Sequence, residues 1–383
     1  MPSTSRRNFL KYGLTGAVVA VVGGVGGYLA MTAGPAGPVG PAPKGTLKTA
    51  LISSSFVTDL SFNQHGLELA QKAIENLKPA ATEKGWTDIE FSYSENVAVA
   101  DAERVMRDYI AGGVTMIWEH WGILHEDAIK RVAADHPDVM IASVCSAVPL
   151  APNVPVYCAG AHEGAYLAGW LTGGLCEEYG WKKAGVMTAY KGVNCCDRVV
   201  AGYYYGFDGY NKAHGRIDKA EMVWMQTGTW PDVTKGYETF VALRDAGCGI
   251  IDTIGDGMSF GAMAAAKELN VPIVGHVMDQ SPLAPDQVVT SIYWNFPMQV
   301  LLSDYINDSF MPAKNYLPGM AEGGSDIAPY HNWENKIPSN LKNDIAKIRE
   351  TITSQSLAFV VPRIDYMLEL PAAGTAPVPP GFM

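Results

Sequence analysis

Residues 46–77 read TLKTALISSSFVTDLSFNQHGLELAQKAIENL, and this stretch indicates the fold class of the chain. The opening run, 46–52, has the short apolar and β-branched character of a strand. Apolar residues then recur at helical spacing over 66–77, at Leu67, Ala70, Ile74 and Leu77. The stretch therefore predicts a strand followed by a helix, which is the first half of a βαβ unit.

The same alternation continues along the chain. Further strands are predicted at 88–93, 114–118, 139–144 and 154–158, with helices at 101–111 and 125–135. After about residue 160 the pattern restarts, with helices at 163–179, 198–213, 233–245 and 259–268 and strands at 184–188, 220–226, 249–254 and 272–276. Strict alternation predicts parallel sheets with helices on both faces. Two successive units predict an α/β protein with two doubly wound parallel-sheet lobes around a ligand cleft.

The N-terminus has the pattern of an export signal. Arg6 and Arg7, in the context SRRNFLK, precede a mildly apolar, glycine-rich run that ends near Ala33, which is typical of the twin-arginine route. Residues 1–33 are long enough for a membrane anchor and end in a poor cleavage site, so cleavage and anchoring both stay open. Residues 34–46 form a Pro/Gly linker. We therefore expect a periplasmic or cell-surface protein, which is membrane-anchored if the signal is retained.

Composition limits the function classes. The 383 residues, 48% of them hydrophobic, suffice for two domains of ordinary size. No second apolar run approaches the length of a membrane span, which argues against a permease. The net charge of −11 argues against nucleic acid and anionic lipid as partners.

The cysteines all lie in the predicted exported body, where oxidising surroundings permit disulfides. The six positions are Cys145, Cys158, Cys176, Cys195, Cys196 and Cys248. Cys145 and Cys158 each end a predicted strand, and they are our choice for one bridge. No CxxC spacing occurs, which argues against a zinc site. For the vicinal pair Cys195 and Cys196, burial as small apolar residues is favoured over redox chemistry.

Candidate ligand-binding residues follow the predicted strands, because ligands of such sheets lie beyond the carboxyl ends of the strands. Flat aromatic faces come from Phe62, Trp118, Trp121, Tyr190 and Trp230. Directional hydrogen bonds come from Asp59, Asn63, Asn194, Asp232, Asp256, Asp279 and Gln280. Together they suit a flat heterocycle, which is bound by stacking and by hydrogen bonds at its edge. The alternative is that each ring belongs to the core and each acid caps a helix, for which Asp59 and Asp232 are well placed.

Catalytic patterns are poorly represented. The chain has no G-x-S-x-G elbow, no P-loop and no G-x-G-x-x-G after the first strand, so we expect neither an enzyme nor a cofactor. Glu119, His120 and His125 could hold a metal, but no third clear ligand accompanies the two histidines, and we expect no metal site.

Several ordered motifs resemble the basic membrane protein (BMP) family of ABC-transporter substrate-binding proteins, whose best-known relatives are purine nucleoside receptors. These motifs are DLSFNQ at 59–64, ENV with ADAER at 95–97 and 100–104, EGAYLAG at 163–169, GTWPD at 228–232 and GHVMDQ at 275–280. The match covers roughly residues 47–360. Several blocks in order are far more specific than a single motif.

The resemblance implies a type I periplasmic-binding-protein fold that closes on a purine and delivers it to an ABC permease and its ATPase, with the chain itself a monomer. It implies that Phe62 stacks on the base, that Asp59 and Asn63 shape the first lobe's side of the site, and that Trp230 closes from the second. Asp279 would contact the polar edge of the ligand. Trp294 stands where the family usually has a lysine, which favours a free base over a nucleoside.

On this reading the first lobe comprises 47–158 and about 277–308, the second comprises 159–276 and about 309–365, and 366–383 form a tail. Two other functions stay open. A ligand-sensing module for a membrane receptor needs the same cleft, and neighbouring genes would distinguish it from a transport protein. A nucleoside hydrolase is the third choice, and release of ribose from nucleosides would identify it.

Overall fold

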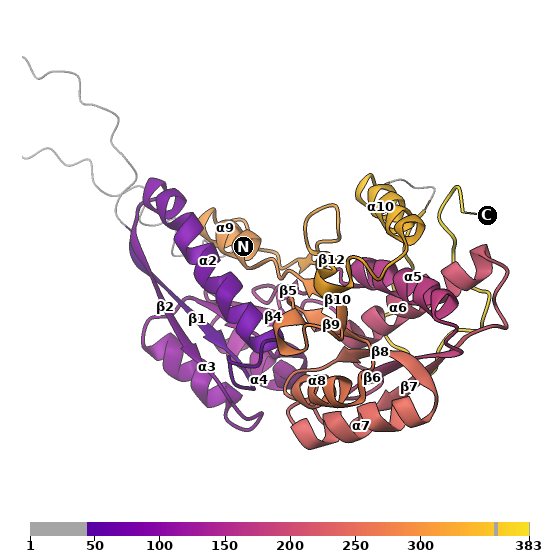
Figure 1. Ribbon diagram of the computed structural model, residues 1–383. Coiled ribbons are helices and arrows are strands. Elements are labelled where there is room, and N and C mark those ends of the chain that lie inside the picture. The colour runs from indigo at the N-terminus through magenta and orange to yellow at the C-terminus, as the bar shows by residue number, and fades with distance from the viewer. Residues whose placement is uncertain (1–43, 356–358, 383) are drawn as a thin grey trace, which may run out of the picture. The chain divides into compact units, whose positions relative to one another are not determined.

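The computed structural model describes residues 44–355 and 359–382 (Figure 1). The predicted export signal and most of the linker lie outside these residues. Among the helices in the described ranges, none combines the length and the apolar character needed to cross a membrane.

The first sheet has the strand order β11-β5-β4-β3-β1-β2, and all its pairs are parallel. Its strands are β1 (Gly45–Ile52), β2 (Trp86–Ser94), β3 (Met116–Glu119), β4 (Met140–Val144), β5 (Val156–Tyr157) and β11 (Asn315–Tyr316). Its helices are α2 (Phe62–Glu83), α3 (Ala102–Ala111), α4 (Gly122–Asp135) and α9 (Met298–Ile306). We call this sheet with its helices the first lobe.

The alternation of side chains along β1 explains how both faces of the first sheet are covered. Leu47 and Leu51 share a core with residues of α2, whereas Ala50 and Ile52 share a core with residues of α3 and α4. Figure 1 shows α2 with α9 beside it, and α3 and α4 across the strands from them. A strand buried on both faces is typical of a parallel α/β sheet.

The second sheet has the order β12-β10-β9-β8-β6-β7, with β12 antiparallel to β10 and the other pairs parallel. Its strands are β6 (Lys183–Thr188), β7 (Glu221–Gln226), β8 (Cys248–Ile254), β9 (Ile273–Val277), β10 (Val288–Trp294) and β12 (Ser325–Ile327). Its α-helices are α5 (His162–Glu178), α6 (Asn194–Ala213), α7 (Val233–Asp245), α8 (Met258–Leu269) and α10 (Ser339–Thr353). Two short 3₁₀ helices, η1 (Ser281–Leu283) and η2 (His331–Trp333), lie in its connections. This sheet and its helices form the second lobe.

Glycines let α5 and α6 pack with their backbones in close approach. A Cβ atom built on Gly169 would lie 1.9 Å from the carbonyl oxygen of Tyr203, and one on Gly206 would lie 2.0 Å from that of Tyr166. No side chain fits at such distances, so the EGAYLAG motif that contains Gly169 has a packing function.

The predicted fold class is confirmed, and every predicted strand and helix is present with its ends shifted by a few residues. Two segments differ from the predicted lobe boundaries. Strand β10 pairs with β9 in the second sheet, although about 277–308 was expected in the first lobe. Strand β11 pairs with β5 in the first sheet, although about 309–365 was expected in the second lobe. Strand β10 belongs to the second sheet because it pairs in parallel with β9 after a short connection. The chain returns to the first lobe only with the next helix, α9, which packs on α2.

Within the described residues the chain passes between the lobes three times, between β5 and α5, between β10 and α9, and between β11 and β12. The lobes touch at the carboxyl ends of their strands. Ser61 Oγ donates a hydrogen bond to the carbonyl oxygen of Gly255 at 3.1 Å, and Gln280 Nε2 donates to that of Leu60 at 3.0 Å. The structure therefore describes a closed arrangement of the cleft.

Candidate ligand-binding site

A pocket lies between the lobes at the carboxyl ends of the strands, where the sequence predicted it. Its cavity volume is about 30 Å³, which is room for only a water molecule or two, so the cleft must open to admit a ligand. The first lobe lines it with Phe62, Trp121, Ile123, Val144 and Cys145. The second lobe lines it with Val193, Cys195, Cys196, Trp230, Ile254, Gly255, Asp256, Val277 and Trp294. The lining is therefore almost entirely apolar.

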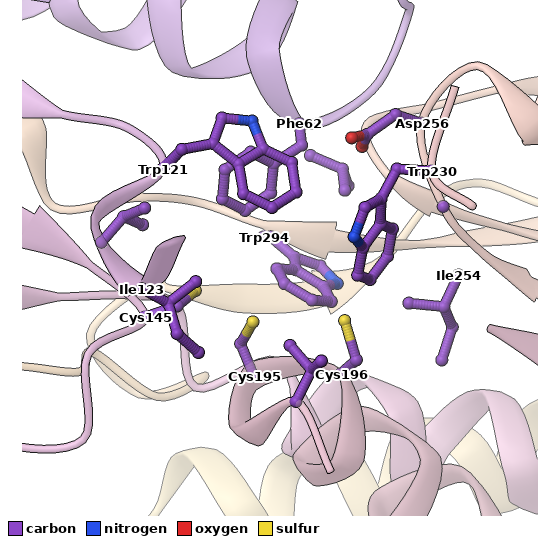
Figure 2. A pocket seen from close by; sticks show the side chains of 14 residues that line it. Phe62, Trp121, Ile123, Cys145, Cys195, Cys196, Trp230, Ile254, Asp256 and Trp294 are labelled. Carbon is purple, nitrogen blue, oxygen red and sulfur yellow. The ribbon is translucent and has the colours of Figure 1, made fainter. Parts of the chain in front are cut away.

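Aromatic rings from both lobes form the walls of the pocket. Figure 2 shows the indoles of Trp121, Trp230 and Trp294 gathered around it. The ring centres of Trp121 and Trp230 are 5.8 Å apart, and those of Phe62 and Trp294 are 6.2 Å apart. Both pairs are edge-to-face and join residues of opposite lobes. Such walls offer flat surfaces to a planar ligand.

A network of hydrogen bonds at the start of α2 orients the first lobe's rings. The Asp59 carboxylate accepts the backbone N–H groups of Ser61, Asn63 and Gln64 at 3.0–3.1 Å, so it satisfies the free donors of the helix start. Asn63 donates to Asp59 at 2.6 Å and accepts from Trp121 Nε1 at 2.9 Å. Asp59 and Asn63 thus stand behind Phe62 and Trp121, outside the pocket lining.

Among the described residues that line the pocket, only Asp256 has a carboxylate side chain. It is 4% exposed, and its Oδ2 atom has no hydrogen-bond partner among the described residues. Burial, together with the nearby charge of Asp59, raises the pKa of Asp256 well above its ordinary value. A buried carboxyl oxygen without a partner is costly, and a ligand N–H group would satisfy it.

Further predicted site residues also lie outside the lining. Trp118 is fully buried in β3 and packs edge-on against Phe91 in the core of the first lobe. Asp232 caps α7 by accepting from the backbone N–H of Lys235 at 3.0 Å. Tyr190 is partly exposed; its hydroxyl donates to the carbonyl oxygen of Gly228, and its ring lies 6.0 Å from that of Trp230.

Asp279 also lies outside the lining. Its carboxylate accepts from the backbone N–H of Ser281 at 3.0 Å and lies 2.7 Å from His331 Nε2. Both partners belong to the second lobe's connecting segments, so the local structure accounts for this side chain without a ligand.

Asn194, the first residue of α6, is fully buried directly before the lining residues Cys195 and Cys196. Neither its amide nitrogen nor its amide oxygen has a hydrogen-bond partner among the described residues. Buried amides are rarely left unsatisfied, so Asn194 is available to a polar group brought into the site.

Cys145, Cys195 and Cys196 lie in segments that were predicted to line the cleft, and Trp294 was identified through the family resemblance, but no direct ligand contact was predicted for any of them. Trp294 is 2% exposed, and its Nε1–H has no partner among the described residues. Its position at the end of β10 is a second signal for the site, because β10 ends at the same edge as the strands that were considered.

The predicted bridge partners, Cys145 and Cys158, are brought together as free thiols, with their sulfur atoms 3.3 Å apart. The predicted bond itself is not formed. The side chains weighed as metal ligands have separate partners: His125 Nδ1 pairs with Glu119 at 2.7 Å, whereas His120 bonds to Tyr157 at 2.8 Å. Burial lowers the pKa of His120 to about 3, so its ring is neutral beside Phe62.

Comparison with known proteins places this architecture among transport proteins. Residues 46–357 match the Bmp family, described as ABC transporter substrate-binding protein PnrA-like. Basic membrane protein A2 of Borrelia garinii subsp. bavariensis is 25% identical over 321 residues, which cover 82% of this chain and 88% of that protein. The putative ABC transporter glucose-binding protein TsgA13 of Haloferax volcanii is 23% identical over 279 residues, covering 72% and 67%.

Among solved structures, an ABC transporter solute-binding protein of Aeropyrum pernix K1 superposes with a TM-score of 0.68 at 21% identity. The alignment covers 83% of this chain and 94% of that one. The predicted type I periplasmic-binding-protein fold is thereby confirmed.

Proposed function

The chain belongs to the family of PnrA-like ABC transporter substrate-binding proteins, and we propose that its ligand is a purine base or a similar flat heterocycle. Proteins of this family bind solutes rather than transform them, and they work outside the cytoplasm with an ABC permease and ATPase. The chain is accordingly a binding protein and not an enzyme. The twin-arginine route and import of the captured base are part of the proposal.

The observation that carries the choice of ligand is the unpartnered Oδ2 atom of Asp256 in an otherwise apolar, aromatic pocket. A heterocycle stacks its faces on indoles and presents N–H groups at its edge, which matches rings on several sides and one carboxyl group. Burial raises the pKa of Asp256, so its protonated form is also accessible and can donate to a ring nitrogen while accepting from an N–H.

A sugar fits this lining less well. Each hydroxyl of a buried sugar needs a hydrogen-bond partner, and unpaired polar groups cost binding free energy. Among the lining side chains the strong hydrogen-bonding groups are the Asp256 carboxyl and the indole N–H groups. The glucose named for the Haloferax volcanii relative is therefore not the ligand we propose for this chain.

A free base is favoured over a nucleoside because the Trp294 indole, which is part of the lining, occupies space that a ribose would need. This indole is nearly fully buried and lies close to the Phe62 ring, which leaves less space for a ribose. We propose that Trp294 restricts the site to ligands without a bulky substituent.

The ligand that copurifies with the protein provides an unbiased test. The wild-type protein and a Trp121→Ala Trp230→Ala double variant would be produced in a bacterium, purified and denatured. Mass spectrometry would then identify the small molecules released from each protein, and the two sets would be compared. We expect a purine or related heterocycle in the wild-type extract and its depletion from the variant. A hexose or an amino acid that depends on the same two indoles would overturn the proposal.

A further inference from the structure

The thiols of four cysteines meet beside the ligand pocket. Cys145 follows β4 and Cys158 follows β5, so both belong to the first lobe, whereas Cys195 and Cys196 lie in the first turn of α6 in the second lobe. The Cys145 and Cys158 sulfur atoms are 3.3 Å apart, and the Cys195 thiol hydrogen bonds with both and with Cys196. Figure 2 shows the Cys195 and Cys196 sulfur atoms pointing into the pocket from the start of the helix. The cluster therefore joins the two lobes.

The thiols of Cys145, Cys158 and Cys195 differ in acidity. Hydrogen bonds from Cys145, Cys158 and Cys196, supported by Arg198, lower the pKa of Cys195 well below its ordinary value. The helix start also favours a thiolate at this position. Burial raises the pKa of Cys145, so Cys145 stays a thiol. Thiol–disulfide exchange needs a thiolate next to a disulfide, and Cys195 lies next to the pair Cys145 and Cys158, which can form one.

Contact between Cys195 and Cys145 depends on closure, because the two residues belong to opposite lobes. The same closure brings Trp121 to Trp230 and Ser61 to Gly255. A disulfide between Cys145 and Cys158 lies within one lobe and leaves the cleft free to open. A disulfide between Cys145 and Cys195 crosses the cleft.

We propose that Cys145, Cys158 and Cys195 form an exchange site in which a disulfide moves from Cys145–Cys158 to Cys145–Cys195 and thereby holds the cleft closed. In the first step, Cys145 and Cys158 lose two electrons and two protons to a small-molecule disulfide, which becomes two thiols. In the second step, the Cys195 thiolate, which the Cys196 thiol and Arg198 still stabilise once Cys145 and Cys158 are oxidised, attacks the Cys145 sulfur atom, the bond to Cys158 breaks, and Cys158 leaves as a thiolate. This second step needs no further oxidant.

Arg198 lies beside the exchange site. It follows Cys195 by one turn of α6, is 4% exposed, and its positive charge favours the thiolate forms of both Cys195 and Cys158, although the hydrogen bond from Cys195 and burial raise the pKa of Cys158 to about 12 overall. The negative charge that develops on the departing Cys158 sulfur atom is therefore partly balanced by this guanidinium. Arg198 is in turn held by Asp365, with Nε and Oδ1 2.5 Å apart.

The test uses the full-length protein, prepared reduced and then exposed to oxidised glutathione, without any added ligand. Non-reducing peptide mapping by mass spectrometry should find a Cys145–Cys195 link, and thiol titration should find four free thiols of the original six. Small-angle scattering should show a smaller radius of gyration for the oxidised protein, restored by dithiothreitol. Because no purine is used, failure of the ligand assignment leaves this test unaffected.

Variants separate the steps. Cys195→Ser should stop at the Cys145–Cys158 link and keep the radius of the reduced protein. Cys176→Ser, buried in α5 and outside the cluster, is the matched control that should still form the link across the cleft. A wild-type protein that yields only Cys145–Cys158, a Cys195–Cys196 link, or six free thiols after oxidation would overturn the proposal.

Discussion

Trp121 of the first lobe and Trp230 of the second meet across the pocket, with ring centres 5.8 Å apart and ring planes at 62°. Trp121 is fixed from behind, because its Nε1–H donates to Asn63. Trp230 lies in the loop before α7, and its ring centre is 6.0 Å from that of Tyr190. A planar ligand that enters between these indoles would contact both lobes at once, so its binding is coupled to closure.

Replacement of Trp230 by alanine tests that coupling. Aromatic pairs contribute about 0.5–1.5 kcal/mol beyond simple burial, and burial of the ring adds to this, so Trp230→Ala should weaken adenine binding about tenfold or more. Isothermal titration calorimetry gives the affinity. Trp224→Ala, in β7 and outside the lining, is the control and should leave it unchanged. Equal affinities for Trp230→Ala and wild type would contradict closure by Trp230.

Asp256→Asn should weaken adenine binding, because the variant replaces a carboxyl oxygen by an amide donor. Hydrogen bonds to charged groups contribute about 1.5–3 kcal/mol, so a loss of about tenfold or more is expected. Asp256→Asn with wild-type affinity would show that the unpartnered oxygen does not meet the ligand.

The same variant should change the pH dependence of stability in a defined direction. Burial raises the pKa of Asp256 above 3.8, so the folded state favours the neutral acid. Its contribution to stability is fully present below pH 3.8 and is lost as the pH rises through the raised folded value. Asp256→Asn is neutral throughout, so the unliganded variant should have a higher Tm than wild type at pH 7, with the difference shrinking towards pH 4. A lower Tm at pH 7 would contradict this account.

Asp279→Asn tests a residue that the family resemblance assigned to the ligand and that the structure pairs with Ser281 and His331. We expect adenine affinity to stay within about twofold, since the carboxylate is not part of the lining. His331→Gln, which removes the partner, should behave in the same way. A large loss of affinity in Asp279→Asn alone would restore the ligand contact implied by the resemblance.

Gly206→Ala should destabilise the second lobe, because the added methyl group would lie 2.0 Å from the carbonyl oxygen of Tyr166 and force α5 and α6 apart. Overpacking of this kind typically costs about 1–3 kcal/mol. Gly112→Ala, where the nearest atom is 3.3 Å away and φ is −76°, is the control and should stay close to wild type. Urea denaturation measures both. Equal urea midpoints for Gly206→Ala and wild type would show that α5 and α6 can move apart without loss of stability.

The periodicity of the sequence was sufficient to predict the two sheets, because strands buried on both faces and amphipathic helices are local patterns. It was also sufficient to place Phe62, Trp121, Trp230 and Asp256 at the pocket, since strand ends converge in this fold. It could not decide which strand-end acids face inward. Asp59 and Asp232 satisfy backbone donors at helix starts, and that choice depends on geometry rather than on residue type.

The contacts that the thiols and Trp294 make across the cleft could not be predicted from the sequence, for another reason. Cys145 and Cys195 are distant in sequence and meet because the lobes close, which no local pattern encodes. Trp294 reaches the site through β10, whose place in the second sheet was not anticipated. Side chains that act by packing against the opposite lobe carry no motif of their own.

Calorimetry of the wild-type protein with adenine, adenosine and glucose tests whether the pocket binds a purine base. We expect adenine to bind with micromolar or tighter affinity, adenosine to bind more weakly because of Trp294, and glucose to give no heat of binding. Micromolar binding of glucose with no heat from either purine would contradict this expectation.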